Sequence, residues 1–199
     1  MGKLLRVELT RNKIVEEPLK EELAEKFIGG PGIGTKILYN ELPHWAGALD
    51  PLNLLIFSTG PLTGTPVPST GRHFVNTKSP LTGYLGEANA GGFWGAELKF
   101  AGYDLVVVSG RSAKPVYLYI DNGHVEIRHA KPYWGMDARE ADRAIRKDIG
   151  DKKARVIDIG QAGENLVLIS GIMGEEASRA AARCGVGAVM GFKKLKAIA

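Results

Sequence analysis

The sequence predicts an α+β fold, a single domain built from two similar halves, and three observations lead to this prediction. A strand hairpin followed by an amphipathic helix occurs near the N-terminus and again after residue 115. Each unit continues into an apolar strand and an arginine-bearing loop, at a spacing of about one hundred residues. Glycine accounts for 26 of 199 residues and gathers at 29–34, 60–102 and 185–191. We therefore expect one domain over 1–199, with mixed or antiparallel sheets and repeats at about 1–90 and 105–199.

The first half begins with a predicted hairpin. Residues 4–9 alternate apolar and polar side chains as a strand does, and residues 13–16 return beside them. Pro18 suits the start of a helix. The apolar side chains that follow share one helical face; they are Leu19, Leu23 and Phe27. Glycines at 29–32 end this helix, and residues 54–58 form an apolar strand that leads through a loop to Arg72.

The second half repeats this plan. Residues 116–120 and 124–128 are predicted to pair across the sequence DNG at 121–123, which is typical of a tight hairpin. Asp137 and Glu140 have the spacing of a helix capping box, and Gly150 suits the helix end. Residues 166–170 form the matching apolar strand, which leads to Arg179 and Arg183. The alanine-rich residues 177–182 are predicted to be helical.

Residues 91–102 join the two halves and are too apolar for a linker. Their large side chains favour burial; they are Phe93, Trp94, Leu98 and Phe100. Residues 194–199 (KLKAIA) are predicted to form a strand, and we expect the chain to be cut from, or paired with, something larger. The alternative to a duplication is that two hairpins and two helices arose by chance in a small protein.

The composition indicates an ordinary globular protein, with 44% hydrophobic and 24% charged residues. No apolar run approaches the roughly 18 residues of a membrane span, and the N-terminus leads into a strand and not into a signal peptide. We therefore expect a cytoplasmic protein that does not bind membranes. The single cysteine, Cys184, excludes an internal disulfide and an all-cysteine cluster site within one chain.

The charge does not decide the class of ligand. A net charge of +4 and a pI of 9.1 fit an anionic small molecule as well as a nucleic acid. The case for nucleic acid rests on Lys193, Lys194 and Lys196, while other basic residues are mixed with acidic ones and no stacking aromatic residues accompany them. We expect no nucleic-acid partner.

Two glycine motifs imitate known sites. Residues 29–36 (GGPGIGTK) nearly spell a phosphate-binding P-loop, but Thr35 precedes Lys36 and a helix precedes the glycines. A closely packed helix–turn–helix connection is the better interpretation. Residues 185–191 (GVGAVMG) approximate a dinucleotide fingerprint but lack its spacing and its βαβ unit. The histidines show no metal-binding spacing, and we expect them to be surface or satisfied core residues; they are His44, His73, His124 and His129.

One pattern does indicate a ligand site. Residues 71–95 (GRHFVNTKSPLTGYLGEANAGGFWG) combine exposed backbone with an arginine, and glycine-rich loops offer backbone groups to phosphates and polar heterocycles. Arg72, Arg179 and Arg183 supply forked donors for phosphate or carboxylate. A duplicated domain offers two such loops, so the pattern favours a ligand that is doubled or carries two phosphate arms. The alternative is that each arginine caps a helix or forms a surface ion pair.

At these residues the sequence resembles the N-terminal domain of the tungsten-dependent aldehyde:ferredoxin oxidoreductase family. The likeness covers essentially the whole chain, in order. The motifs that carry it are GPLTGTPVPSTGR (60–72), TKSPLTG (77–83), ANAGGFWGAELKFAGYD (88–104), AGENLV (162–167), and GVGAVMG (185–191) with KLKAIA (194–199).

The resemblance implies that the domain is a base on which a tungsten bis-pterin cofactor lies, with a magnesium ion between the pterin phosphates. It implies that Arg72 lies between a pterin and an iron–sulfur cluster. It also implies that the backbone carbonyls of Asn89 and Ala180 hold the magnesium ion. The other implied cofactor contacts lie in two loops; they are Gly91, Gly92, Arg179, Ala182 and Arg183. Ala182 and Cys184 stand where family members often carry glycine, which indicates a tighter or shifted second loop.

The implied function is cofactor binding in an enzyme of anaerobes that oxidises an aldehyde to a carboxylate and passes electrons to ferredoxin. The resemblance places the cysteines of a 4Fe-4S cluster, and the residues that handle substrate protons, in further domains. The implied partners are therefore these C-terminal domains or a separate subunit, and ferredoxin through the complete enzyme; a homodimer is compatible with this. The alternative is a non-catalytic module that carries the cofactor or binds nothing. The aldehyde, and the choice of tungsten or molybdenum, stay open.

Overall fold

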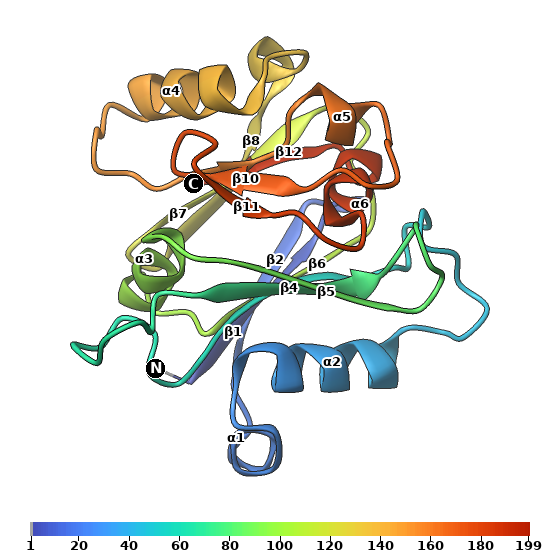
Figure 1. The fold of residues 1–199 in the computed structure, drawn as a ribbon, viewed down its shortest axis with the longest axis vertical. Helices are drawn as coiled ribbons and strands as arrows, with labels where there is room; N and C mark the ends of the chain where they lie inside the picture. The colour runs from blue at the N-terminus through green and yellow to red at the C-terminus, as the bar shows by residue number, and fades with distance from the viewer. Residues whose placement is uncertain (1) are drawn as a thin grey trace.

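The computed structural model describes residues 2–199, which form two six-stranded sheets packed against each other (Figure 1). The strands of the first sheet lie in the order β2 (Lys13–Pro18), β1 (Lys3–Glu8), β6 (Leu105–Ser109), β3 (Leu55–Thr59), β4 (His73–Lys78) and β5 (Leu85–Ala90). Those of the second lie in the order β8 (His124–His129), β7 (Val116–Asp121), β12 (Leu195–Ile198), β9 (Ile157–Asp158), β10 (Ile172–Gly174) and β11 (Arg179–Ala181). The expected α+β class is confirmed.

The two sheets share one topology, because each strand of the second corresponds to the strand six places earlier in the chain. β1 pairs in parallel with β6, as β7 does with β12, and the other neighbouring strands pair antiparallel. The internal duplication is therefore confirmed. The repeat boundary lies between β6 and β7. Residues 105–109 belong to the first half, and not to the second as expected, because β6 is hydrogen-bonded between β1 and β3.

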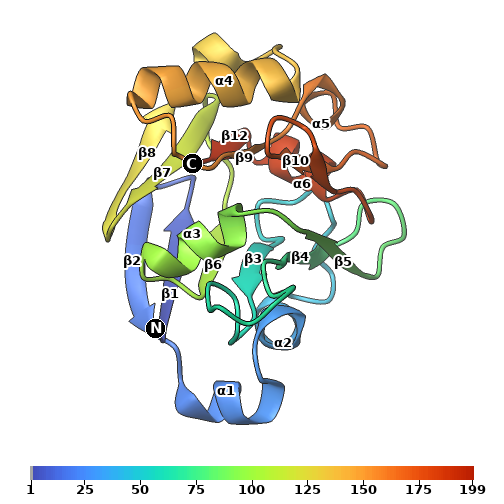
Figure 2. The same cartoon turned by 60° about the vertical axis from the view of Figure 1, so that its left-hand side comes forward.

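The helices follow the same repeat. α1 (Glu21–Phe27) and α2 (Gly30–Glu41) come after the first hairpin, as the 3-10 turn η1 (Lys131–Tyr133) and α4 (Ala138–Ile149) come after the second. α2 and α4 lie on the outer faces, at the bottom and top of Figure 1. α3 (Trp94–Phe100) precedes β6, and α6 (Val186–Phe192) precedes β12, while the short α5 (Gln161–Glu164) follows β9. Figure 2 shows α3 in front of the join between the two halves.

The glycine run at 29–34 forms the expected helix–turn–helix connection. α1 ends at Phe27 and α2 begins at Gly30, so the glycines lie in the turn and the first turn of α2. A side chain at Gly34 would overlap the amide of Asn76, and one at Gly32 would overlap the carbonyl of Phe27. The glycines therefore allow α2 to pack tightly against α1 and β4.

The start of α4 confirms the predicted capping box. Oδ1 of Asp137 accepts a hydrogen bond from the amide of Glu140 at 2.9 Å, and Oε2 of Glu140 accepts one from the amide of Asp137 at 3.2 Å. The helix ends at Gly150, whose φ of 79° is left-handed, as the sequence predicted. Ala141 and Ile145, on the inner face of α4, are fully buried.

Two predictions in the second half are wrong. Residues 166–170 form no strand, and β9 at 157–158 takes the place that corresponds to β3. The apolar side chains of that segment instead lie exposed in a loop; they are Val167, Leu168 and Ile169. Residues 177–182 are not helical, because 179–181 pair with β10 as strand β11. Pairing with a neighbouring strand here overrides the helix propensity of alanine.

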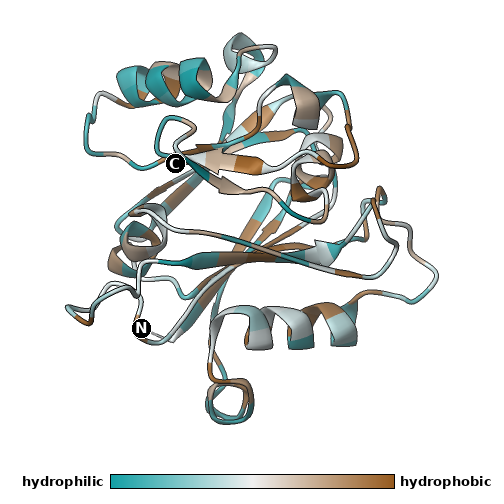
Figure 3. Ribbon diagram, viewed as in Figure 1, coloured by the Kyte–Doolittle hydropathy of each residue, from teal (hydrophilic) through white to brown (hydrophobic). Residues whose placement is uncertain are grey.

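The largest core cluster is shared by the two halves. It joins Leu5, Phe57 and Val106 of the first sheet with Leu118 and Ile198 of the second, and α3 and α6 also contribute to it. Figure 3 shows these apolar strands between more polar outer surfaces. A second cluster lies beneath α2 and a third beneath α4. The two sheets therefore form one hydrophobic core.

The junction at 91–102 is only partly buried. Trp94 and Leu98 lie in the shared core, as expected. Phe93 and Phe100 are 59% and 61% exposed, which corrects the prediction that they are buried. They differ because Trp94 and Leu98 lie four positions apart on the inner face of α3, whereas Phe93 precedes the helix and Phe100 ends it.

The C-terminal strand is confirmed as β12, and it removes the basis for a nucleic-acid site. Lys193 and Lys196 are fully buried, so phosphates cannot reach two of the three lysines in that cluster. Within residues 2–199, no helix combines the length and the apolar character that crossing a bilayer requires.

Candidate cofactor site

The two sheets meet at their edge strands, β5 and β11, which contact each other. Asn89 of β5 lies opposite Phe74 of β4, and Ala180 of β11 lies opposite Met173 of β10. In each hairpin this pair is the second one counted from the open end, opposite the turn. Asn89 and Ala180 are therefore equivalent positions of the duplication. The sequence analysis selected both, and the structure places them on adjoining edges.

The loop after each edge strand carries the other selected residues. Gly91 and Gly92 follow Asn89 by two and three positions, as Ala182 and Arg183 follow Ala180. The second of these loops lies against the hairpin of the first half, because a Cβ built at Gly86 of β5 would lie 3.0 Å from Cβ of Cys184. We refer to residues 89–93 as the first cofactor loop and to residues 180–184 as the second.

The first cofactor loop is joined to the loop that carries Arg72. Nη1 of Arg72 donates a hydrogen bond to Oδ1 of Asn89 at 2.5 Å. A Cβ at Gly71 would lie 2.9 Å from the carbonyl oxygen of Gly92, so only glycine allows the two backbones this close. Gly92 has a φ of +106°, while a Cβ at Gly91 would meet no atom within 4 Å. Gly91 therefore borders open space.

The second cofactor loop presents cations to solvent. Arg179, Ala182 and Arg183 are exposed. No ion pair within residues 2–199 includes Arg72, Arg179 or Arg183. Their guanidinium groups are therefore available to an anion, and the alternative that they form surface ion pairs is wrong.

His73 lies buried beside this site, although the sequence predicted an ordinary surface or satisfied core histidine. It is 2% exposed, and neither ring nitrogen has a hydrogen-bond partner in the described part of the chain. Its ring packs edge-on against Trp94, with centroids 4.9 Å apart. Burial lowers the pKa of His73 from 6.5 to about 4, so the imidazole is neutral near pH 7. The expectation of a satisfied or surface residue is corrected here.

Glu175 is the second residue that the sequence analysis missed. Its carboxylate accepts a hydrogen bond from the backbone amide of Phe93, at the end of the first cofactor loop, at 2.9 Å. Glu175 lies in the sequence GEEAS, which is typical of a solvated turn, and no local signal connects it with a loop 82 residues earlier.

These groups suit a doubly anionic ligand better than a metal ion alone. Across residues 2–199 no group of three or more His, Cys, Asp and Glu side chains is arranged to hold a metal ion. The site instead offers three arginines that form no ion pair in the described part of the chain, open backbone at Gly91 and two equivalent backbone positions. Arginine binds phosphate in a forked geometry, and a hard cation such as Mg²⁺ takes oxygen ligands, with phosphates completing its shell. The donor set therefore suits a ligand that carries two phosphate groups.

Comparison with known proteins identifies the family of this chain. The family model described as "Aldehyde ferredoxin oxidoreductase, N-terminal domain" matches residues 4–199. The chain is 50% identical over 198 residues to a tungsten-containing aldehyde ferredoxin oxidoreductase of Pyrococcus furiosus, and 52% identical to that of Thermococcus kodakarensis. Each alignment covers the whole chain but 33% of the relative, so this chain spans about a third of the length of these relatives.

A solved structure is also similar. It is a chain of the active site complex BamBC of benzoyl coenzyme A reductase, determined in complex with 1,5 dienoyl-CoA. The TM-score is 0.97 at 42% identity, and the match covers 99% of this chain and 30% of that one. On the family model, the two relatives and this structure together, the chain belongs to the aldehyde ferredoxin oxidoreductase family and corresponds to its N-terminal domain.

Proposed function

We propose that this chain binds a tungsten bis-pterin cofactor within an enzyme that oxidises an aldehyde to a carboxylate and passes the electrons to ferredoxin. The observation that carries the proposal is the equivalence of Asn89 and Ala180 on adjoining strands. Two equivalent backbone positions suit a ligand with two similar arms. The relatives at 50% and 52% identity are named as tungsten-containing enzymes, which supports the choice of metal.

The residues of this chain would bind and orient the cofactor. Arg179 and Arg183 would donate to the phosphates, and Arg72, held by Asn89, would lie between a pterin and the iron–sulfur cluster. The carbonyls of Asn89 and Ala180 would bind a magnesium ion between the phosphates. The open backbone of the first and second cofactor loops, at Gly91, Gly92 and Ala182, would lie against the pterins. When bound, the cofactor supplies two-electron redox chemistry at the metal, and the protein supplies orientation and electrostatics.

The rest of the reaction needs parts outside this chain. A single cysteine cannot hold a 4Fe-4S cluster, so the proposal assigns that cluster, the substrate pocket and the ferredoxin contact to further domains or to a separate subunit. Neutral His73 adds no charge beneath the cofactor. The three arginines therefore supply the positive charge of this side of the site.

The test is the metal and pterin content of the protein purified from a host that makes the tungsten cofactor. We expect tungsten with about two pterins per metal. The double variant R179Q/R183Q should retain at most about one fifth of that pterin, because each arginine supplies a charge-assisted hydrogen bond to phosphate. The variant R11Q, which changes an exposed arginine on the distant β1–β2 turn, is the matched control and should bind normally.

The alternative function, a module that binds nothing, gives a different result. Protein that is folded but contains neither tungsten nor pterin, when isolated from such a host, would contradict the proposal. Full pterin content in R179Q/R183Q would contradict the assignment of the second cofactor loop.

A further inference from the structure

The turn between β10 and β11 has an uncommon backbone. Glu175, Glu176 and Ala177 have φ values of 53°, 53° and 64°, in the left-handed region that residues with side chains rarely adopt. Ser178 closes the turn, since its amide and its hydroxyl donate to the carbonyl of Glu175 at 3.1 and 2.8 Å. Such a conformation persists where the surroundings fix it. The turn leads directly into β11 and the second cofactor loop.

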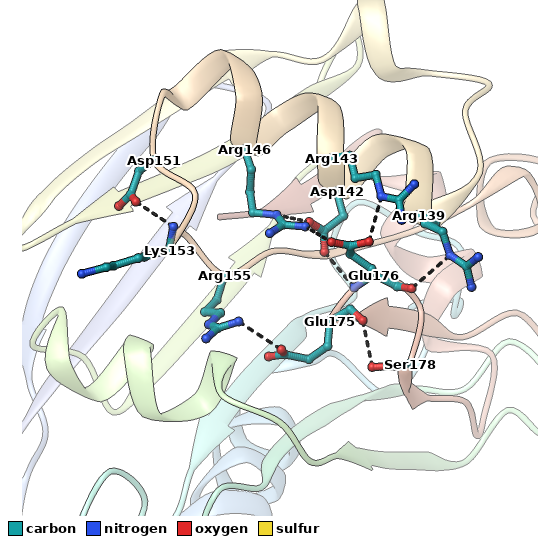
Figure 4. Close-up of polar contacts among 10 residues, drawn as sticks. All are labelled: Arg139, Asp142, Arg143, Arg146, Asp151, Lys153, Arg155, Glu175, Glu176 and Ser178. Carbon is teal, nitrogen blue, oxygen red and sulfur yellow. Dashed lines mark hydrogen bonds and ion pairs between the residues drawn. The ribbon is translucent and has the colours of Figure 1, made fainter.

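Helix α4 holds this turn from one side, through Glu176 (Figure 4). Oε1 of Glu176 accepts a hydrogen bond from Nη2 of Arg146 at 2.5 Å, and Oε2 accepts one from Nε of Arg143 at 2.8 Å. The amide of Glu176 donates to Oδ2 of Asp142 at 3.0 Å. A third arginine, Arg139, donates to the Glu176 carbonyl at 3.4 Å. The turn is therefore fixed to the second half by several contacts.

Glu175 reaches from this turn to the first half. Its Oε1 accepts a hydrogen bond from the amide of Phe93 at 2.9 Å. Its Oε2 accepts one from Nη1 of Arg155 at 3.3 Å, which Figure 4 shows. The guanidinium carbon of Arg155 lies 4.7 Å from the centre of the Phe93 ring. A Cβ built at Gly92 would lie 3.0 Å from Cγ of Glu175. One side chain thus connects the turn before β11 with the first cofactor loop.

A matching contact connects the hairpin turn of the first half with the second cofactor loop. Oγ of Ser79, at the end of β4, donates to the carbonyl of Cys184 at 2.8 Å. Cys184 follows Ala180 by four positions, as Phe93 follows Asn89. The hairpin turn of each half therefore holds the cofactor loop of the other half at an equivalent position. The first loop is held by a carboxylate and the second by a hydroxyl.

We propose that Glu175 is a positioning residue that sets the separation of the two cofactor loops, with Arg155 holding its carboxylate in place. The inference rests on the proposed function, because it matters only if both loops bind one ligand. A ligand bound at both ends binds well only when the two ends are held at a fixed distance. The competing explanation is an ion pair that stabilises the fold and has no effect on the ligand.

The test uses the complete enzyme, this chain together with its further domains or partner subunit, purified from a host that makes the tungsten cofactor. We compare E175A and E175Q with the wild type and with R143Q. R143Q is the matched control because it removes an ion pair to the same turn but touches neither cofactor loop. The measurements are tungsten and pterin per chain after gel filtration, the electron paramagnetic resonance spectrum of W(V), and the midpoint of thermal unfolding.

We expect E175A to retain at most about one fifth of the wild-type pterin, and its remaining W(V) signal to broaden or shift, because the loops are no longer held at one distance. E175Q keeps an oxygen that accepts from the Phe93 amide, so it should recover at least about half of the pterin. R143Q should match the wild type in pterin content and in its W(V) spectrum. If E175A does not fold, E175D replaces it, since its shorter side chain keeps the charge but withdraws from Phe93.

Each other result has one meaning. Wild-type pterin content and an unchanged spectrum in E175A would overturn the positioning role and leave the proposed function intact. An equal loss in R143Q would also overturn it, because the effect would then follow general stability. A wild-type protein without tungsten or pterin would overturn the proposed function, and this inference with it.

Discussion

His73 is a buried residue beside the cofactor loops that contributes to the response of the protein to pH. Its pKa is about 4 in the folded chain and 6.5 when exposed. Between these values the unfolded chain binds a proton that the folded chain does not bind. The contribution of His73 to the free energy of unfolding is therefore complete above pH 6.5 and decreases as the pH falls towards 4, by at most about 3 kcal/mol.

We expect the substitution H73L to weaken this acid dependence. Leucine fills a similar apolar site against Trp94 and cannot be protonated, so the loss of unfolding free energy between pH 7 and pH 4.5 should shrink by about 2 kcal/mol. Urea unfolding at several pH values measures this. H44Q, at an exposed histidine whose side chain forms no ion pair in the described residues, is the control and should keep the wild-type slope. An unchanged slope in H73L would assign the acid dependence to other groups.

Gly92 permits a second test at the scale of one residue. Its φ is +106°, and a Cβ there would meet Glu175, whereas Gly102 has a φ of +101° and open space around it. In both alanine variants the left-handed backbone lowers the free energy of unfolding by roughly 1–2 kcal/mol. Only G92A also displaces Glu175. We expect G92A to lower the free energy of unfolding by about 1 kcal/mol more than G102A does.

The origin of that extra cost is tested by a double-mutant cycle. In the E175A background, the cost of G92A should fall to that of G102A, because the displaced side chain is absent. If the extra cost persists in E175A, the collision with Glu175 is not its cause.

The sequence analysis identified only part of the site at this scale. Arg72, Asn89 and Arg183 lie in glycine-rich segments and could be selected from local pattern and family resemblance. His73 and Glu175 could not, because their roles depend on residues distant in the chain. A buried, unpaired imidazole and a carboxylate that reaches another loop have no local sequence signal.

At the scale of elements, length decided which predictions succeeded. The two long hairpins and the capped helix α4 have enough residues to show a period, and they are confirmed. β9, β10 and β11 have two or three residues each and show none. Such short strands form because neighbours in the sheet satisfy their backbone groups. The apolar run at 166–170 was therefore mistaken for a strand.

β12 contains a buried lysine, Lys196, which contacts three other segments of the second half. Nζ of Lys196 donates to the carbonyls of Met136 and Ile159 at 3.0 and 2.6 Å, and to Oε1 of Glu164 in α5 at 2.5 Å. The lysine side chain is 0% exposed and that of Glu164 is 5% exposed. Removing the cation alone would leave a buried carboxylate without its partner.

We expect K196M to lower the free energy of unfolding by about 3–5 kcal/mol, the usual cost of breaking a buried ion pair from one side. K194M is the control, because Lys194 makes one exposed hydrogen bond to Ala113, and it should cost less than about 1 kcal/mol. The double variant K196M/E164L should recover most of the loss, as apolar replacement of both partners often does. Equal effects of K196M and K194M in urea unfolding would contradict this.

At the scale of the whole molecule, the duplication was visible in the sequence but its boundary was not. Hairpin and helix recur at a constant spacing, which local patterns reveal. β6 joins the first half because it pairs in parallel with β1, and a pairing between strands about one hundred residues apart leaves no periodic signal. The shared core also follows from three-dimensional packing and not from either half alone.

This shared core predicts how the molecule unfolds. Trp94 of the first half donates its indole N–H to the carbonyl of Ile198 in the second at 3.2 Å, and its ring lies in the common core. Neither sheet can keep its inner face buried once the other has unfolded. We therefore expect the two halves to unfold in one cooperative transition, although each half has a complete sheet.

Single-tryptophan variants test this expectation, since Trp94 reports on the join between the two halves and Trp134 on the second half. With the exposed Trp45 replaced by phenylalanine, W45F/W134F and W45F/W94F leave one reporter each. After correction for the stability of each variant, measured by circular dichroism, the fluorescence and circular dichroism midpoints should agree within about 2 °C. The separate fragments 1–110 and 111–199 should remain unfolded, because each exposes half of the common core. Two separated transitions, or one fragment that folds alone, would show that the halves are independent units whose contact at β5 and β11 forms only after each has folded.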